Sequence, residues 1–227
     1  MAEPVPPGHQ PPGAAPRSAA PAGAAEAAQL EQLLRARGAL RTGHFLLSSG
    51  LHSEHYVQCQ AVLAQPPEAE RLGAALAARF GGAAVDLVVA PALGGVIVGY
   101  EVARALGCPA LFAERYQGQL MLRRGQQVPA GARVLVVEDV VTTGGSAREV
   151  VELVRGAGGV PVGVAALLDR TAPDLPPIFG ELRFEALLRL QAPAWRPEDC
   201  PRCRRGEPLE SPGSRRAGAE SGGAGGR

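Results

Sequence analysis

The amino-acid sequence predicts an α/β fold, a doubly wound and mainly parallel sheet with helices on both faces. Runs rich in β-branched residues, of which VLVV at 134–137 is the clearest, indicate buried strands. They alternate with longer runs whose apolar residues have helical spacing, and this strand–helix–strand order occurs three times. Gly-rich turns separate the runs. A parallel sheet with helical crossovers accounts for all three observations.

Each element is expected where a periodic run begins and a glycine stops it. Gly38 ends the first helix, and Gly81 with Gly82 ends the second. Ser146 and Glu149 have the spacing of a capping box, in which two side chains satisfy free N–H groups at a helix start. In chain order we expect helices over 27–37, 68–80, 96–106 and from 146 to the glycines at 156–159, and strands over 44–47, 56–57, 85–90, 110–113, 134–137 and 162–168.

Composition places one folded domain between two tails. Residues 1–25 hold seven Pro and eight Ala but no Leu, Ile, Phe, Tyr or Trp, so we expect 1–26 to be disordered. Residues 206–227 hold seven Gly and are expected to form a flexible tail. The remaining segment, 27–205, is long enough for one domain with a sizeable core.

The charged residues and the hydropathy of the chain exclude several classes of function. The chain has 23 basic and 22 acidic residues, and every basic residue is Arg. Without Lys there is no Schiff-base chemistry and no lysine phosphate clamp. A net charge of +1 gives no electrostatic footprint for nucleic acid. No apolar stretch approaches a membrane span, and the Pro-rich start does not resemble a secretory signal, so we expect a soluble cytoplasmic protein.

The cysteines do not predict a metal site within one chain. Four Cys residues are too sparse for a disulfide framework. Cys200 and Cys203 form a single CxxC, whereas a structural zinc needs four ligands, so a zinc would have to be shared between two subunits. His44, His52 and His55 are expected to be turn residues near the substrate pocket, and we predict no protein-ligated metal.

The segment VLVVEDVVTTGGS, residues 134–146, carries the clearest chemical motif. Two carboxylates, Glu138 and Asp139, end a buried strand, and a Thr-Thr-Gly-Gly-Ser loop then enters a helix. Free N–H groups and the helix dipole make such a loop an anion site. Carboxylates would repel a phosphate, so this pair more plausibly accepts hydrogen bonds from sugar hydroxyls. The alternative is a capped helix with incidental acids.

Two further turns are expected at the same edge of the sheet. Ala92-Leu93-Gly94-Gly95 joins the strand at 85–90 to the next helix and again offers backbone N–H groups to an anion. Arg170 follows the strand at 162–168 and lies 28 residues after Thr142, one helix and one strand away. The alternative interpretation of Arg170 is a solvated charge on the surface, without a role in binding.

These motifs resemble those of the type I phosphoribosyltransferases, and in order and spacing those of bacterial orotate phosphoribosyltransferases. The resemblance rests on HFLLSSGLHSEHY at 44–56, PALGG at 91–95, EDVVTTGGS at 138–146 and LDR at 168–170, and it covers about 30–205. It implies a small hood subdomain formed by the N-terminal and C-terminal segments. It also implies a reaction between orotate and phosphoribosyl pyrophosphate (PRPP) that gives orotidine 5′-phosphate and pyrophosphate in pyrimidine (UMP) synthesis.

The resemblance assigns a role to each motif. Thr142 and Arg170 would bind orotate, the arginine through the orotate carboxylate. The residues implied to bind PRPP are Glu138, Asp139, Val140, Val141, Thr142, Thr143, Gly144, Gly145 and Ser146, with Ala92, Leu93, Gly94 and Gly95 at the pyrophosphate. Mg²⁺ would bridge pyrophosphate and ribose oxygens with few protein ligands. Arg115, Arg123, Arg124 and Asp139 are the implied catalytic residues.

The loop at 113–131 departs from the family pattern. Members of the family usually carry a mobile loop rich in Arg, Lys and His that reaches into the site of a neighbouring subunit, which implies a homodimer. This chain offers only the three arginines there, as in a shorter-loop bacterial subgroup, and their alternative is a solvated hairpin tip or a local Glu114–Arg115 ion pair. Ser48 and Leu51 stand where many members have basic residues. Two rival functions remain: a phosphoribosyltransferase for a purine or uracil, and a PRPP-sensing regulator of the same fold.

Overall fold

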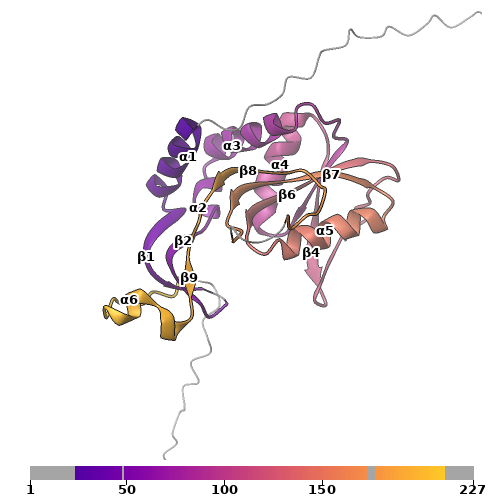
Figure 1. The fold of residues 1–227 in the computed structure, drawn as a ribbon. Helices are drawn as coiled ribbons and strands as arrows, with labels where there is room; N and C mark the ends of the chain where they lie inside the picture. Colours follow the sequence, from indigo (N-terminus) through magenta and orange to yellow (C-terminus); the bar gives the residue numbers. More distant parts are fainter. Residues whose placement is uncertain (1–23, 48, 173–176, 213–227) are drawn as a thin grey trace, which may run out of the picture.

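The computed structural model describes residues 24–47, 49–172 and 177–212, and it confirms the α/β prediction. Its main sheet has six strands in the order β5-β4-β3-β6-β7-β8 (Figure 1). All neighbours pair in parallel except the β4–β5 hairpin. The strands are β3 (Leu87–Pro91), β4 (Ala110–Tyr116), β5 (Gln119–Met121), β6 (Arg133–Val141), β7 (Val160–Asp169) and β8 (Phe184–Arg189).

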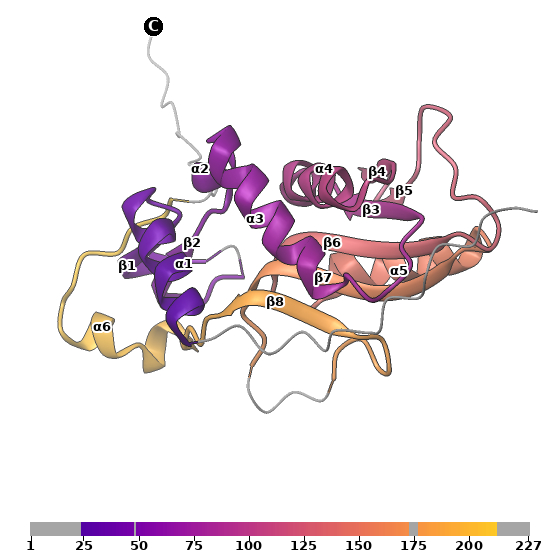
Figure 2. The same ribbon diagram turned by 90° about the horizontal axis from the view of Figure 1, so that it is seen from above.

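Helices cover both faces of this sheet. α3 (Pro66–Arg79) and α4 (Gly94–Leu106) lie together on one face, and α5 (Gly145–Gly156) lies on the other (Figure 2). Side chains of β6 point alternately to the two layers: Leu135 packs in the core of α4, and Val136 in the core of α5. A strand buried on both sides needs an unbroken apolar sequence, which explains VLVV.

A second, smaller sheet forms a hood beside the main one. It has the order β1-β2-β9 and joins β1 (Leu40–Leu46) and β2 (His52–Val57) to β9 (Ala194–Trp195), so the N-terminal and C-terminal segments build it together. A short helix, α6 (Pro201–Arg204), lies next to this sheet (Figure 1). The remaining helices are α1 (Ala24–Ala36), α2 (Gln60–Leu63) and the 3-10 turn η1 (Pro197–Asp199).

Both tails are shorter in the structure than the sequence predicts. α1 begins at Ala24, so 24–26 are helical and not part of the first tail. The C-terminal tail was set too early, because the backbone of Glu210 pairs with β1: its N–H donates to the carbonyl of His44, and Leu46 N–H donates to its carbonyl, each at 2.8 Å. Arg41 adds an ion pair with Glu210. The rest of the expected tails, 1–23 and 213–227, and Ser48 lie outside the described residues.

One local prediction was wrong, and one alternative does not occur among the described residues. The capping box does not form, because the Glu149 carboxylate accepts hydrogen bonds from Arg115 at 3.0 and 3.1 Å and from Leu120 N–H at 3.3 Å. Gly144 is the N-cap of α5, and no side chain caps that helix. The local Glu114–Arg115 pair is also absent among the described residues, since Glu114 pairs with Arg123 and Arg124 instead.

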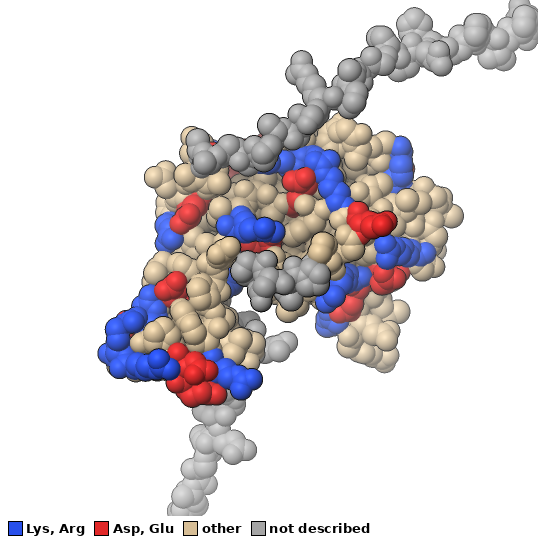
Figure 3. All heavy atoms as spheres, viewed as in Figure 1, with Lys and Arg blue, Asp and Glu red and all other residues tan. Residues whose placement is uncertain are grey.

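The surface carries its charges in mixed order. Figure 3 shows blue and red side chains interspersed on the face drawn, in keeping with ion pairs such as Arg133–Asp86 at 2.8 Å. Within the described ranges, none of the helices has the length and apolar character that crossing a bilayer requires.

Candidate active site

Three turns meet at the carboxyl edge of the main sheet. They follow β3, β6 and β7, which are consecutive neighbours in the strand order. From β3 the chain crosses through α4 to β4, and from β6 it crosses through α5 in the opposite direction to β7. This is a topological switch point, where open α/β sheets bind their ligands.

A cavity of about 230 Å³ lies at the turn after β6. Its lining contains most of the residues that the sequence predicts for a phosphate loop. The lining residues are Glu138, Val140, Val141, Thr142, Thr143, Gly144, Gly145, Ser146, Ala147 and Glu149. Of residues 138–146, only Asp139 is not part of this lining.

The start of α5 supplies hydrogen-bond donors to this cavity. The first intrahelical bond goes from Arg148 N–H to the carbonyl of Gly144, at 2.9 Å, so the N–H groups of 145–147 precede the helical ladder. With no side-chain cap present, these donors and the helix dipole remain available to an anion. Gly144 has φ +72°, and a Cβ there would meet Ile178 Cδ1 at 2.8 Å, so the turn requires glycine.

The acidic pair ends β6 in a largely buried setting. Glu138 is only 8% exposed, and its carboxylate accepts the N–H of Asp139 at 3.2 Å. Burial, and next the neighbouring charge of Asp139, raise the pKa of Glu138 to about 9. Burial likewise raises the pKa of Asp139, against hydrogen bonds that lower it. A ligand that donates hydrogen bonds or brings positive charge would therefore stabilise the ionised forms of these two acids.

The turn after β3 approaches the acidic pair closely. A Cβ on Gly94 would lie 2.6 Å from a carboxylate oxygen of Asp139, and one on Gly95 would lie 2.9 Å from the carbonyl of Val137. Both glycines therefore allow the start of α4 to pack against β6. Leu93 is 79% exposed beside them. The structure thus brings the second predicted anion turn, 92–95, next to the first.

Arg170 and Thr142 lie on adjacent strand ends, as the sequence predicts. Val141 of β6 is opposite Asp169 of β7, and Arg170 N–H donates to the carbonyl of Val141 at 2.8 Å. The Arg170 side chain is half-buried, and its Nε has no hydrogen-bond partner in the described part of the chain. Burial lowers the pKa of this guanidinium, which still carries its charge at neutral pH. A buried cation without a partner is costly and is suited to an anionic ligand.

The three histidines expected in the first turn lie on strands instead, His44 on β1 and His52 and His55 on β2, and they separate. His55 is within the electrostatic range of Arg170: burial lowers the pKa of His55, and the charges of Arg35 and Arg170 lower it further against the attraction of Glu54. His44 and His52 instead face each other, with 3.0 Å between Nε2 of His44 and Nδ1 of His52, and they lie next to Cys200 and Cys203. Only His55 therefore neighbours the strand-end site.

The predicted catalytic arginines lie on the β4–β5 hairpin and the loop after it. Arg115 pairs with Glu149, which lines the cavity, and also donates to the carbonyl of Gly118 at 2.7 Å. Arg123 stacks over Tyr116 with 4.4 Å between its Cζ and the ring centre, and Arg124 donates to Glu114 at 3.2 Å. In Figure 1 the β4 arrow extends past α5, so the hairpin projects from the domain.

Sequence reasoning missed Glu149 as a lining residue and missed Ile178 and Phe179 behind Gly144. The apolar pair IF in the Pro-rich stretch TAPDLPPIFG was the available signal, because large apolar residues in a loop indicate packing. A second hollow, about 1230 Å³, adjoins the site: an open groove between the hairpin and α5 lined by Leu120, Met121 and Leu153 among others. It shares Gly145 and Glu149 with the cavity at the start of α5.

Comparisons with known proteins agree with this geometry. The family described as "Phosphoribosyl transferase domain" matches residues 59–187. An orotate phosphoribosyltransferase of Pelotomaculum thermopropionicum is 50% identical over 190 residues, which cover 83% of this chain and 97% of the relative. An orotate phosphoribosyltransferase of Thermotoga maritima is 48% identical over 186 residues, or 82% and 98%.

Solved structures give the same result. A crystal structure of Mycobacterium tuberculosis H37Rv orotate phosphoribosyltransferase in complex with inorganic phosphate matches with a TM-score of 0.60 and 29% identity, over 73% of this chain and 96% of that one. The orotate phosphoribosyltransferase of Aeropyrum pernix matches with a TM-score of 0.61 and 27% identity, over 71% and 94%. The M. tuberculosis enzyme in complex with PRPP matches with a TM-score of 0.56 and 26% identity, over 74% and 92%.

Proposed function

Since the chain belongs to the orotate phosphoribosyltransferase family, we propose that it transfers the phosphoribosyl group of PRPP to orotate. The products are orotidine 5′-phosphate and pyrophosphate, in pyrimidine nucleotide synthesis. The reaction is a pentosyl transfer that needs two anionic substrates held side by side. Its site is the strand edge formed by the turns after β3, β6 and β7.

The observation that carries this proposal is the half-buried Arg170 next to Thr142. Its Nε lacks a partner in the described residues, and its strand end adjoins the one that leads into the cavity at the start of α5. A carboxylate satisfies a guanidinium with two parallel hydrogen bonds. Among the bases considered, orotate carries such a carboxylate, whereas purines and uracil do not. Arg170 therefore favours orotate over the rival acceptors.

Each turn has its own task in the proposed mechanism. The N–H groups of 145–147 and the hydroxyls of Thr142, Thr143 and Ser146 bind the 5-phosphate, and the turn at 92–95 binds pyrophosphate. Glu138 and Asp139 accept hydrogen bonds from ribose hydroxyls, which would offset the burial that raises the pKa values of both groups. The residues position both reactants so that an oxocarbenium-like ribose C1 passes from pyrophosphate to the base.

The acidic pair also fits Mg²⁺. Carboxylate oxygens are the ligands that this cation prefers, and a cation beside Glu138 and Asp139 would offset the burial that raises the pKa values of both groups. A bound Mg²⁺ would supply positive charge to the departing pyrophosphate. We propose that these two side chains hold it indirectly, through the ribose oxygens and water that they orient.

We further propose that the chain acts as a homodimer in which Arg115, Arg123 and Arg124 of one subunit reach the pyrophosphate of the other. Two features support this: the arginines lie on or beside a projecting hairpin, and an open apolar groove flanks that hairpin. Arginine is charged at every physiological pH, so a lysine-free loop retains its electrostatic role. A cytoplasmic location remains a prediction.

The test is the fall in orotate absorbance with PRPP and Mg²⁺, measured for the wild type, Arg170→Ala and a control. We expect Arg170→Ala to lower kcat/KM for orotate by about 10- to 100-fold, the value of a charged hydrogen-bonded pair, with PRPP binding unchanged. Arg155→Ala, which removes an exposed arginine at the far end of α5, should match the wild type.

Other outcomes overturn parts of the proposal. Consumption of adenine, guanine, xanthine or uracil in place of orotate would keep the PRPP site and replace the acceptor. PRPP binding without turnover of any base would favour a PRPP-sensing regulator, which salt-dependent retention on heparin or mixed nucleic acid would then support.

A further inference from the structure

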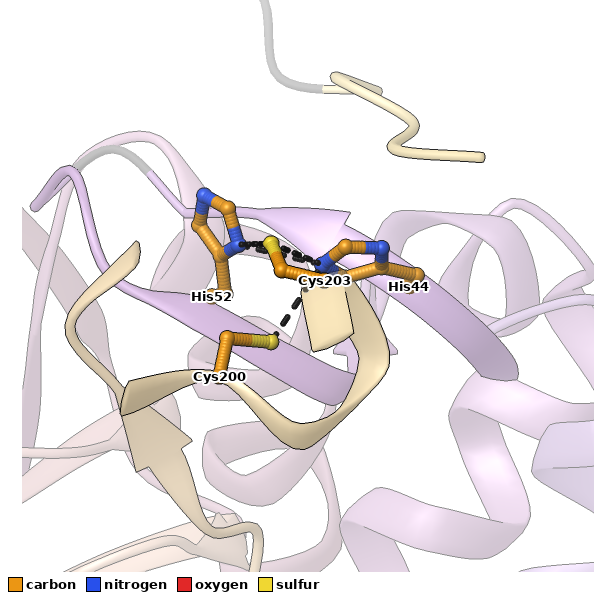
Figure 4. A group of neighbouring side chains, drawn as sticks. All are labelled: His44, His52, Cys200 and Cys203. Atoms are coloured by element: carbon orange, nitrogen blue, oxygen red, sulfur yellow. Dashed lines mark hydrogen bonds between the residues drawn. The ribbon is translucent and has the colours of Figure 1, made fainter. Parts of the chain in front are cut away.

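Two histidines and two cysteines, distant in sequence, converge in the hood. His44 lies on β1 and His52 on β2, Cys200 directly precedes α6, and Cys203 lies on it. Figure 4 shows the four side chains pointing toward one centre. Their ligand atoms all lie within 4.8 Å of one another. The proposed reaction uses none of them.

Four of the six distances between the ligand atoms are within a few tenths of an ångström of the edges of a tetrahedron around one metal ion. His44 Nε2 is 3.0 Å from His52 Nδ1, 3.4 Å from Cys200 Sγ and 3.6 Å from Cys203 Sγ, and Cys203 Sγ is 3.2 Å from His52 Nδ1. Zinc bonds of about 2.0–2.1 Å to nitrogen and about 2.3 Å to sulfur place tetrahedral ligands roughly 3.3–3.8 Å apart. The cluster is thus already close to the required geometry.

Hydrogen bonding alone satisfies this cluster poorly. Nδ1 of His44 lies 2.9 Å from the carbonyl of Glu207, so Nδ1 carries the proton and Nε2 presents a lone pair to the centre. Three neighbours approach that single lone pair, from His52, Cys200 and Cys203. One ring nitrogen accepts one good hydrogen bond, whereas one cation at the centre would satisfy all four atoms. The Glu207 carbonyl has the orienting role that metal-binding histidines require.

Burial and ligand type select the metal. His44 and His52 are 4% and 5% exposed, Cys200 is fully buried, and the two cysteines are free thiols. Two sulfurs and two imidazoles form a soft set typical of zinc, and unlike oxygen ligands they do not suit Mg²⁺. Four protein ligands leave no open position, which is the pattern of a structural site.

We propose that His44, His52, Cys200 and Cys203 of one chain bind a structural Zn²⁺ that fastens the C-terminal segment to the β1–β2 hairpin. This resolves the missing second pair of ligands for the CxxC: the partners are histidines of the same chain, and no second subunit is needed. The ion would hold both ends of the turn at 47–51, because His44 precedes that turn and His52 follows it.

The test measures zinc in the purified full-length chain, by elemental analysis and by titration of metal-free protein with Zn²⁺ and Co²⁺. We expect one zinc per chain and, with Co²⁺, a thiolate charge-transfer band with the visible bands of a tetrahedral centre. Cys203→Ser changes the exposed ligand, which makes misfolding least probable for this variant. It should retain less than about one tenth of the zinc and should weaken the charge-transfer band.

Cys108→Ser is the matched control, because Cys108 is a free, half-buried cysteine away from the hood. It should keep one zinc per chain. A chelator should lower the Tm of the wild type and of Cys108→Ser but leave that of Cys203→Ser unchanged. Equal zinc content in the two serine variants, or no cobalt–thiolate band in the wild type, would overturn the proposal. One zinc per two chains would replace it with a site shared between subunits.

Discussion

The fold shields the Glu138 carboxyl group from the water that would otherwise stabilise its negative charge. Glu138 is buried at the end of the central strand, and its pKa of about 9 results first from that burial and then from Asp139. The free acid of an unfolded chain has a pKa near 4.3. Between these two values the native protein holds a proton that the unfolded chain releases, so the free energy of unfolding decreases as pH rises through this range.

Glu138→Gln should therefore stabilise the protein at alkaline pH, because the amide copies the neutral acid. At pH 8 we expect a Tm higher by about 2–4 °C or more, with the difference from the wild type shrinking toward pH 4.5. Transferase activity should fall, since the amide is a weaker acceptor for ribose hydroxyls. Thermal unfolding at several pH values, without substrates, measures this.

Glu152→Gln provides the control, because Glu152 is an exposed acid on α5 that pairs with Arg155. It should leave the pH dependence of Tm as in the wild type. A Glu138→Gln protein that is less stable than the wild type at pH 8 would show that Glu138 is ionised in the native state.

Residues whose chemistry depends on the end of one strand were predictable from sequence, and residues whose role depends on a distant partner were not. Thr142 and Arg170 follow strands that pair in parallel, so their proximity followed from topology alone. Glu149 was assigned to a capping box because its spacing from Ser146 is right. Its actual partner, Arg115, is 34 residues away on another element. No local pattern contains that information.

At the scale of elements, the contact between α4 and β6 depends on a missing side chain. A methyl group on Gly94 would lie 2.6–2.7 Å from the Asp139 carboxylate, which has to shift to accommodate it. We expect Gly94→Ala to reduce kcat/KM for PRPP by about 10-fold or more, and to cost about 1–3 kcal/mol of stability through overpacking. Steady-state kinetics with varied PRPP and thermal unfolding measure the two effects.

Gly82→Ala is the comparison for that experiment. Gly82 follows α3, has no atom within 4 Å of the position of an added Cβ, and needs no positive φ. It should have the activity of the wild type and equal or slightly higher stability. If Gly94→Ala retained full PRPP affinity, the turn at 92–95 would not be the pyrophosphate site.

The elements that sequence predicted well are those with a one-sided or fully apolar pattern. β6 was predictable because VLVV indicates burial directly. α5 was predicted from a capping box that does not form and from the glycines at 156–159 that end it. β8 was missed: its sequence FEALLR alternates too weakly to exclude a helix, and it becomes a strand by pairing with β7. β5 and β9 have only three and two residues, too short to give a period.

At the scale of the whole molecule, the role of the hairpin arginines depends on how two subunits assemble. If the hairpin of one subunit serves the site of the other, a subunit lacking Arg123 and Arg124 still has a sound binding site. A subunit with Arg170→Ala still has a sound hairpin. Mixing the two variants after dissociation should then restore about a quarter of wild-type activity, because half of the randomly formed dimers contain one intact composite site.

The control for this mixing is each variant dissociated and reassociated alone, which should stay at its own low activity. A mixture no more active than the average of the two would mean that each hairpin serves its own subunit. Both variants alter exposed or ligand-facing side chains, so their Tm values should remain near that of the wild type.

The chain ends were the least predictable part at this scale. The Gly-rich composition of 206–227 predicts a tail, but composition carries no information on long-range contacts. The backbone of Glu210 forms hydrogen bonds with β1, more than 160 positions earlier in the sequence. Two hydrogen bonds to the edge of β1 and the ion pair with Arg41 offset the conformational entropy that is lost when this segment becomes ordered.

The hydrogen bond from Arg170 N–H to Val141 also bears on how new specificities arise in such a domain. The turns proposed to bind the donor sugar and the acceptor leave the sheet from adjacent strands, yet they are separate stretches of chain joined by this backbone hydrogen bond. A substitution at position 170 can thus change the accepted base while the phosphate-gripping turn keeps its shape. Evolution or protein engineering can therefore change the binding site for the base while the binding site for the sugar phosphate is retained.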